Sequence, residues 1–237
     1  MNRTLQKPVH GVHRVHRVHQ VHQVQPGDFD SEKVNFWTHI IGLLIAITAS
    51  VFLLREALAI NSTQALLGIS IFCVVSINLF FASVICHSRF GRQSKHWTKY
   101  DHCAIYLFIA GTFTPMCLFS SLSAWPWFAL GVMWVATAIL INKEINSDVQ
   151  NPPSTLVYLA VGWIGIALAL PLIRSFDFPS IAYCVIGAIL YSVGTVFYRR
   201  SDRWRLAHGT WHTFVVGGTV AHFLMFHSIL SKIKVVA

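Results

Sequence analysis

Seven apolar stretches of about 18–23 residues, separated by short polar breaks, constrain the fold of this chain more than any other feature. An α-helix rises about 1.5 Å per residue, so each stretch can cross the hydrocarbon core of a bilayer, which is about 30 Å thick. The sequence therefore predicts an all-α fold, a seven-transmembrane helix bundle within residues 32–237. The stretches are residues 34–54, 65–87, 101–121, 124–142, 155–173, 179–198 and 208–230.

Composition excludes both a soluble domain and a nucleic-acid binder. Charged residues make up 11% of the chain, against about 25% in an ordinary soluble domain, which leaves too little polar surface to cover a globule. The net charge is +9, but Lys and Arg fall in short runs between apolar stretches, as they do in loops between membrane spans. We therefore expect membrane lipids and lipid-like small molecules as partners, and no nucleic acid.

Residues 1–31 differ in composition from the rest of the chain. A Val-His-x repeat of period three runs from Val9 to Val24, and Pro26-Gly27 closes it. This period fits neither a helix nor a long strand, so we expect a disordered, solvated, histidine-rich tail. Histidine-rich tracts can bind metals, but any zinc bound here is expected to be weak and separate from the main site. No apolar core precedes a small-residue cleavage site, so no removable signal peptide is expected.

The distribution of Lys and Arg predicts the orientation in the membrane. Fourteen of the 18 lie on the side of the N-terminus, and the other side holds Arg55, Arg174, Lys232 and Lys234. Because positive residues accumulate in cytoplasmic loops, we expect a cytoplasmic N-terminus and an external C-terminus.

In this topology, polar residues from distant spans reach one membrane depth. A charge at the centre of a span costs about 2.5–3.5 kcal/mol, so ionisable residues within spans are functional candidates. The second span ends with Ser83 and His87, and the third begins with Asp101. The first and seventh spans begin at the same depth with Glu32, Asn35 and His39, and with His208 and His212, respectively.

His87, His208 and His212 form a candidate metal site. His208 and His212 are four residues apart, so their imidazoles share one helix face and can chelate one ion. With His87 as a third ligand, three protein ligands and a water would complete the arrangement of a catalytic zinc. Imidazole also suits copper, iron and nickel, but zinc is favoured because no thiolate or redox partner is evident. Cys86 points about 100° away from His87 on an ideal helix, which excludes it as a ligand.

Asp101 and Ser83 are the candidate catalytic residues beside this site. Asp101 would hold a water or orient a histidine, as carboxylates near metal ligands do. Taken alone, it would equally suit an N-cap favoured by the helix dipole. Ser83 lies one turn before His87 on the same face, where it would hydrogen-bond the water or a carbonyl oxygen. Taken alone, it would be a small packing residue.

The remaining histidines are not assigned to the site. His96 and His102 are expected in loop or interface positions. His222 follows His212 by ten residues, about 15 Å along a helix, which is too far to share the metal. We expect His222 and His227 to pack against neighbouring helices or to line a cavity. The cysteines lack CxxC spacing and are expected to act as small buried hydrophobes, at positions Cys73, Cys86, Cys103, Cys117 and Cys184.

At these residues the chain resembles the hemolysin III family, the bacterial branch of the progestin and adiponectin receptor (PAQR) group. The resemblance rests on EKVNFWTHIIG (32–42), Ser83 with His87, YDHCAIYLFIAGTFTP (100–115) and HGTWHTFVVGGTVAHF (208–223). It implies seven membrane helices in a bacterial-type inner membrane. It also implies a cytoplasmic-side zinc held by His87, His208 and His212, with Asp101 and Ser83 near the bound water. Relatives often carry an aromatic residue where this chain has Cys86, which affects local packing.

The function expected first is that of a hydrolase that affects membrane composition, and a pore and a receptor remain as alternatives. Resemblance to the wider superfamily that includes alkaline ceramidases implies a zinc-dependent hydrolase of a lipid-like amide or ester, with Asp101 as general base and Ser83 steadying the oxyanion. The family name implies a pore-forming, cytolytic protein, although no charged ring of the kind that gives selectivity is seen in the sequence. A receptor with a structural zinc site needs the same pocket as the enzyme.

Overall fold

Seven α-helices account for nearly all of the chain that the structure describes. The structure is a computed structural model, and it describes residues 28–88, 91, 94–120, 124–147, 155–201 and 203–236. The Val-His-x repeat lies outside these residues. The helices are α1 (Asp28–Ala59), α2 (Thr63–Cys86), α3 (Lys95–Leu118), α4 (Trp125–Asn146), α5 (Thr155–Ala169), α6 (Phe178–Tyr198) and α7 (Ala207–Val236), and a short 3₁₀ helix, η1 (Leu170–Ser175), continues α5. The all-α prediction is confirmed.

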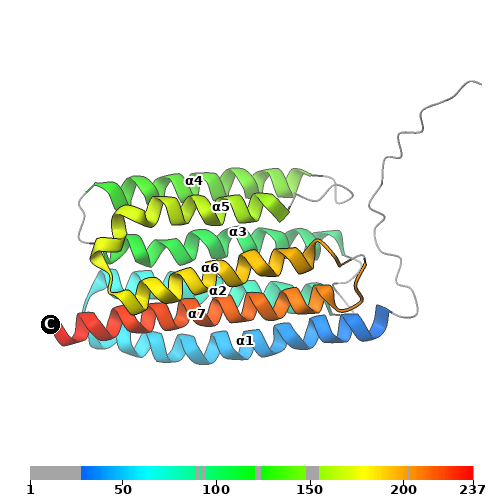
Figure 1. The fold of residues 1–237 in the computed structure, drawn as a ribbon, viewed down its shortest axis with the longest axis horizontal. Helices are drawn as coiled ribbons and strands as arrows, with labels where there is room; N and C mark the ends of the chain where they lie inside the picture. The colour runs from blue at the N-terminus through cyan, green and yellow to red at the C-terminus, as the bar shows by residue number, and fades with distance from the viewer. Residues whose placement is uncertain are drawn as a thin grey trace, which may run out of the picture.

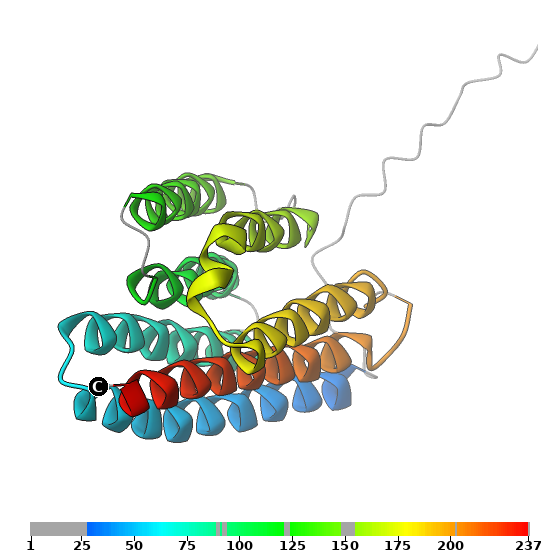
Figure 2. The same cartoon turned by 60° about the vertical axis from the view of Figure 1, so that its left-hand side comes forward.

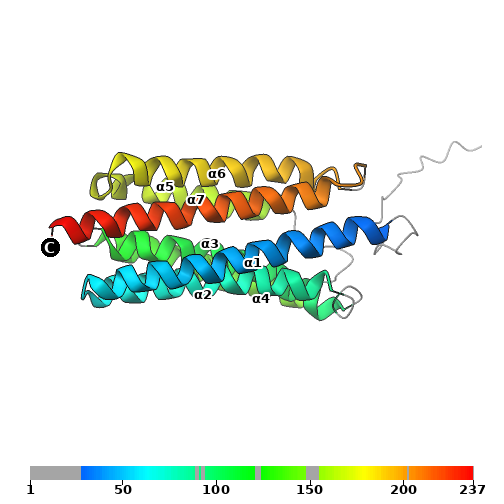
Figure 3. The ribbon, with the colours of Figure 1, turned by 90° about the horizontal axis from the view of Figure 1, so that it is seen from below.

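Six of these helices are long and apolar enough to cross a membrane; α3 does not reach the same hydropathy. The reason is its polar beginning, because α3 starts at Lys95, six residues before the predicted span, and its first turns carry Lys99 and Asp101. It nevertheless runs alongside the others in a single bundle (Figures 1 and 3). This is the architecture of a multi-pass membrane protein.

Local signals in the sequence explain where several helices begin. The side-chain oxygen of Ser62 accepts a hydrogen bond from the backbone N–H of Ala65 at the start of α2. Ser94 does the same for Trp97 at the start of α3. Between α1 and α2, Asn61 adopts a left-handed φ of 54°, a conformation that asparagine tolerates better than most residues. Serine caps thus begin α2 and α3, and Asn61 turns the chain between α1 and α2.

The helices divide into a close-packed side and an open side. The close-packed side comprises α1, α2, α3, α6 and α7. On the open side, α4 packs against α3, and α5 has less extensive contacts with α3, α4 and α6 (Figure 2). A Cβ atom added at Gly111 of α3 would lie 2.4 Å from Val75 of α2, whereas one added at Gly131 of α4 or Gly162 of α5 would meet nothing within 4 Å. Small residues let membrane helices approach closely on the first side, and the second leaves space beside α3.

One end of the bundle gathers the polar residues predicted to share a membrane depth. This end, called here the histidine end, contains the start of α1, α3, α5 and α7 and the end of α2, α4 and α6, and it lies at the right of Figure 1. Helix direction alone brings these segments together, because successive helices run in opposite directions.

Candidate metal centre and adjoining cavity

Four imidazole rings meet at the histidine end and are called here the histidine cluster: His39, His87, His208 and His212. His39 comes from α1, His87 directly follows α2, and the other two begin α7. The ring centroids of His39 and His212 are 3.9 Å apart, and those of His208 and His212 are 4.4 Å apart. The ring of His87 lies 5.0 Å from that of His212 and 5.3 Å from that of His208. The structure therefore brings together the three histidines that the sequence singled out, and adds His39.

Three members of the cluster present nitrogen atoms to one point. His39, His87 and His212 each offer a ring nitrogen, and these atoms all lie within 4.8 Å of one another. His39 is 2% exposed and His212 is fully buried. Both nitrogens of His39, and Nε2 of His212, have no hydrogen-bond partner among the described residues. Buried polar atoms are rarely left without partners, so His39, His87 and His212 fit a bound metal ion, which would accept one lone pair from each histidine.

The first turns of α1 hold the other nitrogens of this cluster in place. Glu32 Oε2 lies 3.1 Å from His87 Nδ1, and Glu32 Oε1 accepts a hydrogen bond from the Asn35 side chain at 3.2 Å. Thr38 Oγ1 lies 3.5 Å from His212 Nδ1. Metal-binding histidines commonly contact a carboxylate or another polar group through the nitrogen that does not face the ion. Glu32 and Thr38 occupy that position here.

Asp101 and Ser83 lie where the histidine cluster meets a cavity. The Ser83 hydroxyl donates a hydrogen bond to Asp101 Oδ1, which joins α2 to α3. Both residues line the cavity together with His39. Ser94 caps α3, so Asp101 stands in its second turn and does not act as an N-cap. The alternative that Asp101 merely caps the third helix is therefore wrong.

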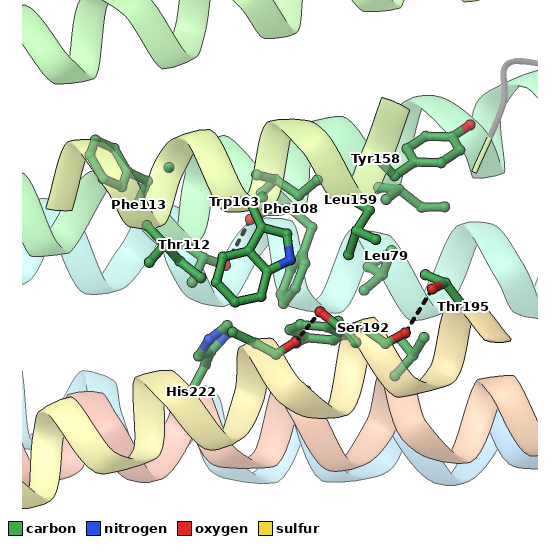
Figure 4. Close-up of a pocket in the computed structure, with 18 of the residues that line it drawn as sticks. Leu79, Phe108, Thr112, Phe113, Tyr158, Leu159, Trp163, Ser192, Thr195 and His222 are labelled. Atoms are coloured by element: carbon green, nitrogen blue, oxygen red, sulfur yellow. Dashed lines mark hydrogen bonds between the residues drawn. The ribbon is translucent and has the colours of Figure 1, made fainter. Parts of the chain in front are cut away.

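The cavity runs along the bundle between α3, α5, α6 and α7 and is mainly apolar (Figure 4). Its α5 lining extends from Thr155 to Ala169, which corresponds to about 21 Å along the helix. Figure 4 shows Tyr158 and Thr195 towards one end of it, and Phe113 and His222 towards the other. Trp163, which also lines the cavity, is 49% exposed. The cavity therefore reaches the side surface of the bundle at α5.

The other singled-out histidines lie apart from the cluster. His102 Nδ1 is 2.8 Å from a buried carboxylate oxygen of Glu144, and His227 Nδ1 is 2.8 Å from Glu56 near the opposite end of the bundle. His222 lines the cavity, one of the two positions expected for it. The sequence places Glu32 and His39 at this depth but does not by itself assign them a role. Their spacing with Asn35 puts all three on one helix face, and that was the available signal.

These features define a class: a helical, multi-pass membrane protein with a buried three-histidine cluster that could hold a metal ion. The family profile described as "Haemolysin-III related" matches residues 28–223. The chain belongs to this haemolysin-III family.

Named relatives agree with this assignment. The chain is 35% identical to "Hemolysin-3 homolog" of Bacillus subtilis, across 81% of this chain and 91% of the relative. It is 32% identical to "Hemolysin-3" of Bacillus cereus, across 81% of this chain and 88% of the relative. A more distant relative is "Adiponectin receptor protein" of Drosophila melanogaster, 21% identical across 81% of this chain and 49% of the relative.

Proposed function

We propose that this protein is a zinc-dependent hydrolase that cleaves an amide or ester bond in a lipid-like molecule within the membrane. The observation that carries this proposal is the junction of a buried histidine cluster with an apolar cavity, with the Asp101–Ser83 pair at the junction. A ligand pocket is typically apolar with a few polar groups placed to fix orientation.

The metal ligands we propose are His87, His208 and His212. His87 and His212 also belong to the set of mutually close nitrogens, which His39 completes. We propose His208 as the third ligand because it pairs with His212 at a four-residue spacing on one face of α7. A zinc ion held there supplies Lewis acidity, which polarises a carbonyl and lowers the pKa of water.

In the proposed reaction, Asp101 carries one proton from water to the leaving group, and Ser83 stabilises the negative charge that forms. As water forms its bond to the carbonyl carbon, its proton passes to the Asp101 carboxylate. Asp101, now neutral, becomes a donor to Ser83 Oγ, which frees the Ser83 hydroxyl hydrogen to turn towards the negatively charged carbonyl oxygen. Asp101 finally gives its proton to the nitrogen or oxygen of the leaving group as that bond breaks. The hydrogen bond from Ser83 to Asp101 is the resting state of this exchange.

The cavity is the proposed site of the acyl chain. Its length and apolar lining suit a single hydrocarbon chain, and the exposed Trp163 marks the side where a chain would pass from the bilayer. The mainly apolar lining also favours a lipid-like ligand over the water-filled path that a pore requires.

The orientation we propose has the N-terminus and the histidine end on the cytoplasmic side of a bacterial inner membrane. The Lys and Arg distribution and the bacterial relatives support this placement.

The test measures metal content and the turnover of lipid amides and esters by the purified protein. Wild type should carry about one zinc ion per chain and release free fatty acid, and His212→Ala should do neither. His96→Ala, at an exposed position at the start of α3, is the matched control and should behave as wild type. Equal turnover in wild type and His212→Ala contradicts the hydrolase.

A further inference from the structure

His222 is a buried ionisable side chain in the mainly apolar far part of the cavity. It lies on α7, ten residues beyond His212, about 15 Å along the helix. The residue is 9% exposed, lines the cavity, and has a buried Nδ1 with no hydrogen-bond partner among the described residues. An ionisable group inside a membrane bundle is costly and is therefore a candidate functional group.

The residues around His222 pack against its imidazole ring but do not hydrogen-bond to its Nδ1. The rings of Tyr191 and Phe108 lie 5.5 Å and 6.4 Å from the imidazole, centroid to centroid. The Tyr191 hydroxyl lies 3.2 Å from Thr219 Oγ1, which provides its hydrogen bond. The imidazole is therefore packed between aromatic rings that leave its buried Nδ1 without a hydrogen-bond partner among the described residues.

A glycine on the neighbouring helix makes room for this ring. A Cβ atom added at Gly187 of α6 would lie 2.7 Å from His222 Nε2, closer than a side chain tolerates. The ring thus fits where α6 carries no side chain. An apolar residue at position 222 would pack there without leaving a polar atom unpaired, so packing alone does not explain a histidine.

We propose that His222 forms a second polar subsite of the cavity, which recognises a hydroxyl group on the hydrocarbon chain of the ligand. This proposal rests on the proposed function, in which the head of the ligand lies at the histidine cluster and its chain extends along the cavity. The hydroxyl would lie about 15 Å from the head, the distance between His212 and His222 along α7.

The chemistry of the subsite selects a hydroxyl over a charged group. A neutral imidazole has one donor and one acceptor nitrogen, and a hydroxyl can use either. Thr112 lies at the same end of the cavity (Figure 4) and donates its own hydrogen to Phe108 O, which leaves its oxygen as an acceptor. In the described lining, the carboxylate of Asp101 is at the opposite end, so a charged group beside His222 would lack a counter-ion.

The experiment measures binding, so it does not depend on catalysis. The purified full chain in lipid nanodiscs is loaded with a fluorescent fatty-acid probe, and the probe is displaced by a saturated fatty acid or by its analogues with one hydroxyl at successive positions. Wild type should prefer one hydroxyl position over the unsubstituted acid by about five- to tenfold, the value of one neutral hydrogen bond. His222→Phe should bind the unsubstituted acid but lose the preference for the hydroxylated one. Gly187→Ala should weaken this preference, because the added methyl displaces the His222 ring. His227→Phe, the same change outside the cavity on the same helix, should keep it.

Each outcome is decisive. If wild type binds all the acids equally, or if His222→Phe keeps the preference, the subsite is refuted while chain binding and the hydrolase proposal stand. If wild type binds none of the acids, both the subsite and the chain-binding part of the proposed function fail. Retained binding of the unsubstituted acid by His222→Phe shows that this variant is folded.

Discussion

The close-packed side and the open side of the bundle hold different parts of the proposed chemistry. On the first, α1, α2 and α7 meet so closely that each of four imidazoles lies against at least two of the others. On the second, α5 stands far enough from α3 and α6 to leave a cavity. Tight packing thus fixes the positions of reactive groups, while loose packing provides space and access for a ligand.

The largest effect is expected from removing metal ligands on the close-packed side. His87→Ala, His208→Ala and His212→Ala should each lose bound zinc, with turnover falling on the order of 10³-fold or more because several kcal/mol of stabilisation disappear. His39→Ala should lose zinc only in part. Zinc analysis of the four purified variants makes this test. Complete loss in His39→Ala with full retention in His208→Ala would replace His208 by His39 in the ligand set.

A smaller loss of turnover is expected from variants of Asp101 and Ser83, which lie where the histidine cluster meets the cavity. Asp101→Asn should keep its zinc but lower turnover by about 10²–10⁴-fold, the usual contribution of a general base. Ser83→Ala should lower it by about 10²-fold, as for loss of one oxyanion donor. Initial rates and zinc content measured on the same samples separate these roles from metal binding. Zinc loss in Asp101→Asn would instead make the aspartate part of the metal site.

A pair of glycine substitutions compares packing on the two sides directly. Gly111→Ala should destabilise the protein by about 1–3 kcal/mol, because the new methyl would overlap Val75. Gly162→Ala should be neutral or stabilising by up to about 1 kcal/mol, because its methyl meets open space and alanine favours a helix. Thermal unfolding in detergent compares the two variants. Equal destabilisation would show that α5 is as tightly packed as α3.

The smallest effect is expected at Asp177, outside the membrane spans, where η1 leads into α6. The Ser180 hydroxyl donates a hydrogen bond to Asp177, which lowers the pKa of this carboxyl below its ordinary value. A lowered pKa in the folded state stabilises the protein above the unfolded pKa of about 4, and this stabilisation is lost as pH falls through the folded pKa. Asp177→Asn should therefore melt slightly below wild type at pH 7, and the gap should close in acid. If the difference in melting temperature between wild type and Asp177→Asn stays the same in acid, the destabilisation comes from packing and not from the carboxylate charge.

The helices can be predicted from the sequence, because a run of about 20 apolar residues has few alternatives to a membrane helix. The histidine end can be predicted as well, because successive helices run in opposite directions. The start of α3 cannot, since the cap at Ser94 extends the helix into polar residues that a hydropathy pattern leaves out. The gathering of His87, His208 and His212 followed from topology. The role of His39 depends on which face α1 turns towards α2 and α7, and packing decides that. The cavity depends on a gap between helices, for which the sequence carries no local signal.

The length of α1 links the histidine cluster to the thickness of the surrounding bilayer. The helix has 32 residues, about 48 Å, while the hydrocarbon core measures about 30 Å, so α1 must tilt or extend beyond the core. Its first turns carry Glu32, Thr38 and His39, which contact His87 and His212. The excess length lets these first turns of α1 lie beyond the hydrocarbon core while they keep their contacts with His87 and His212.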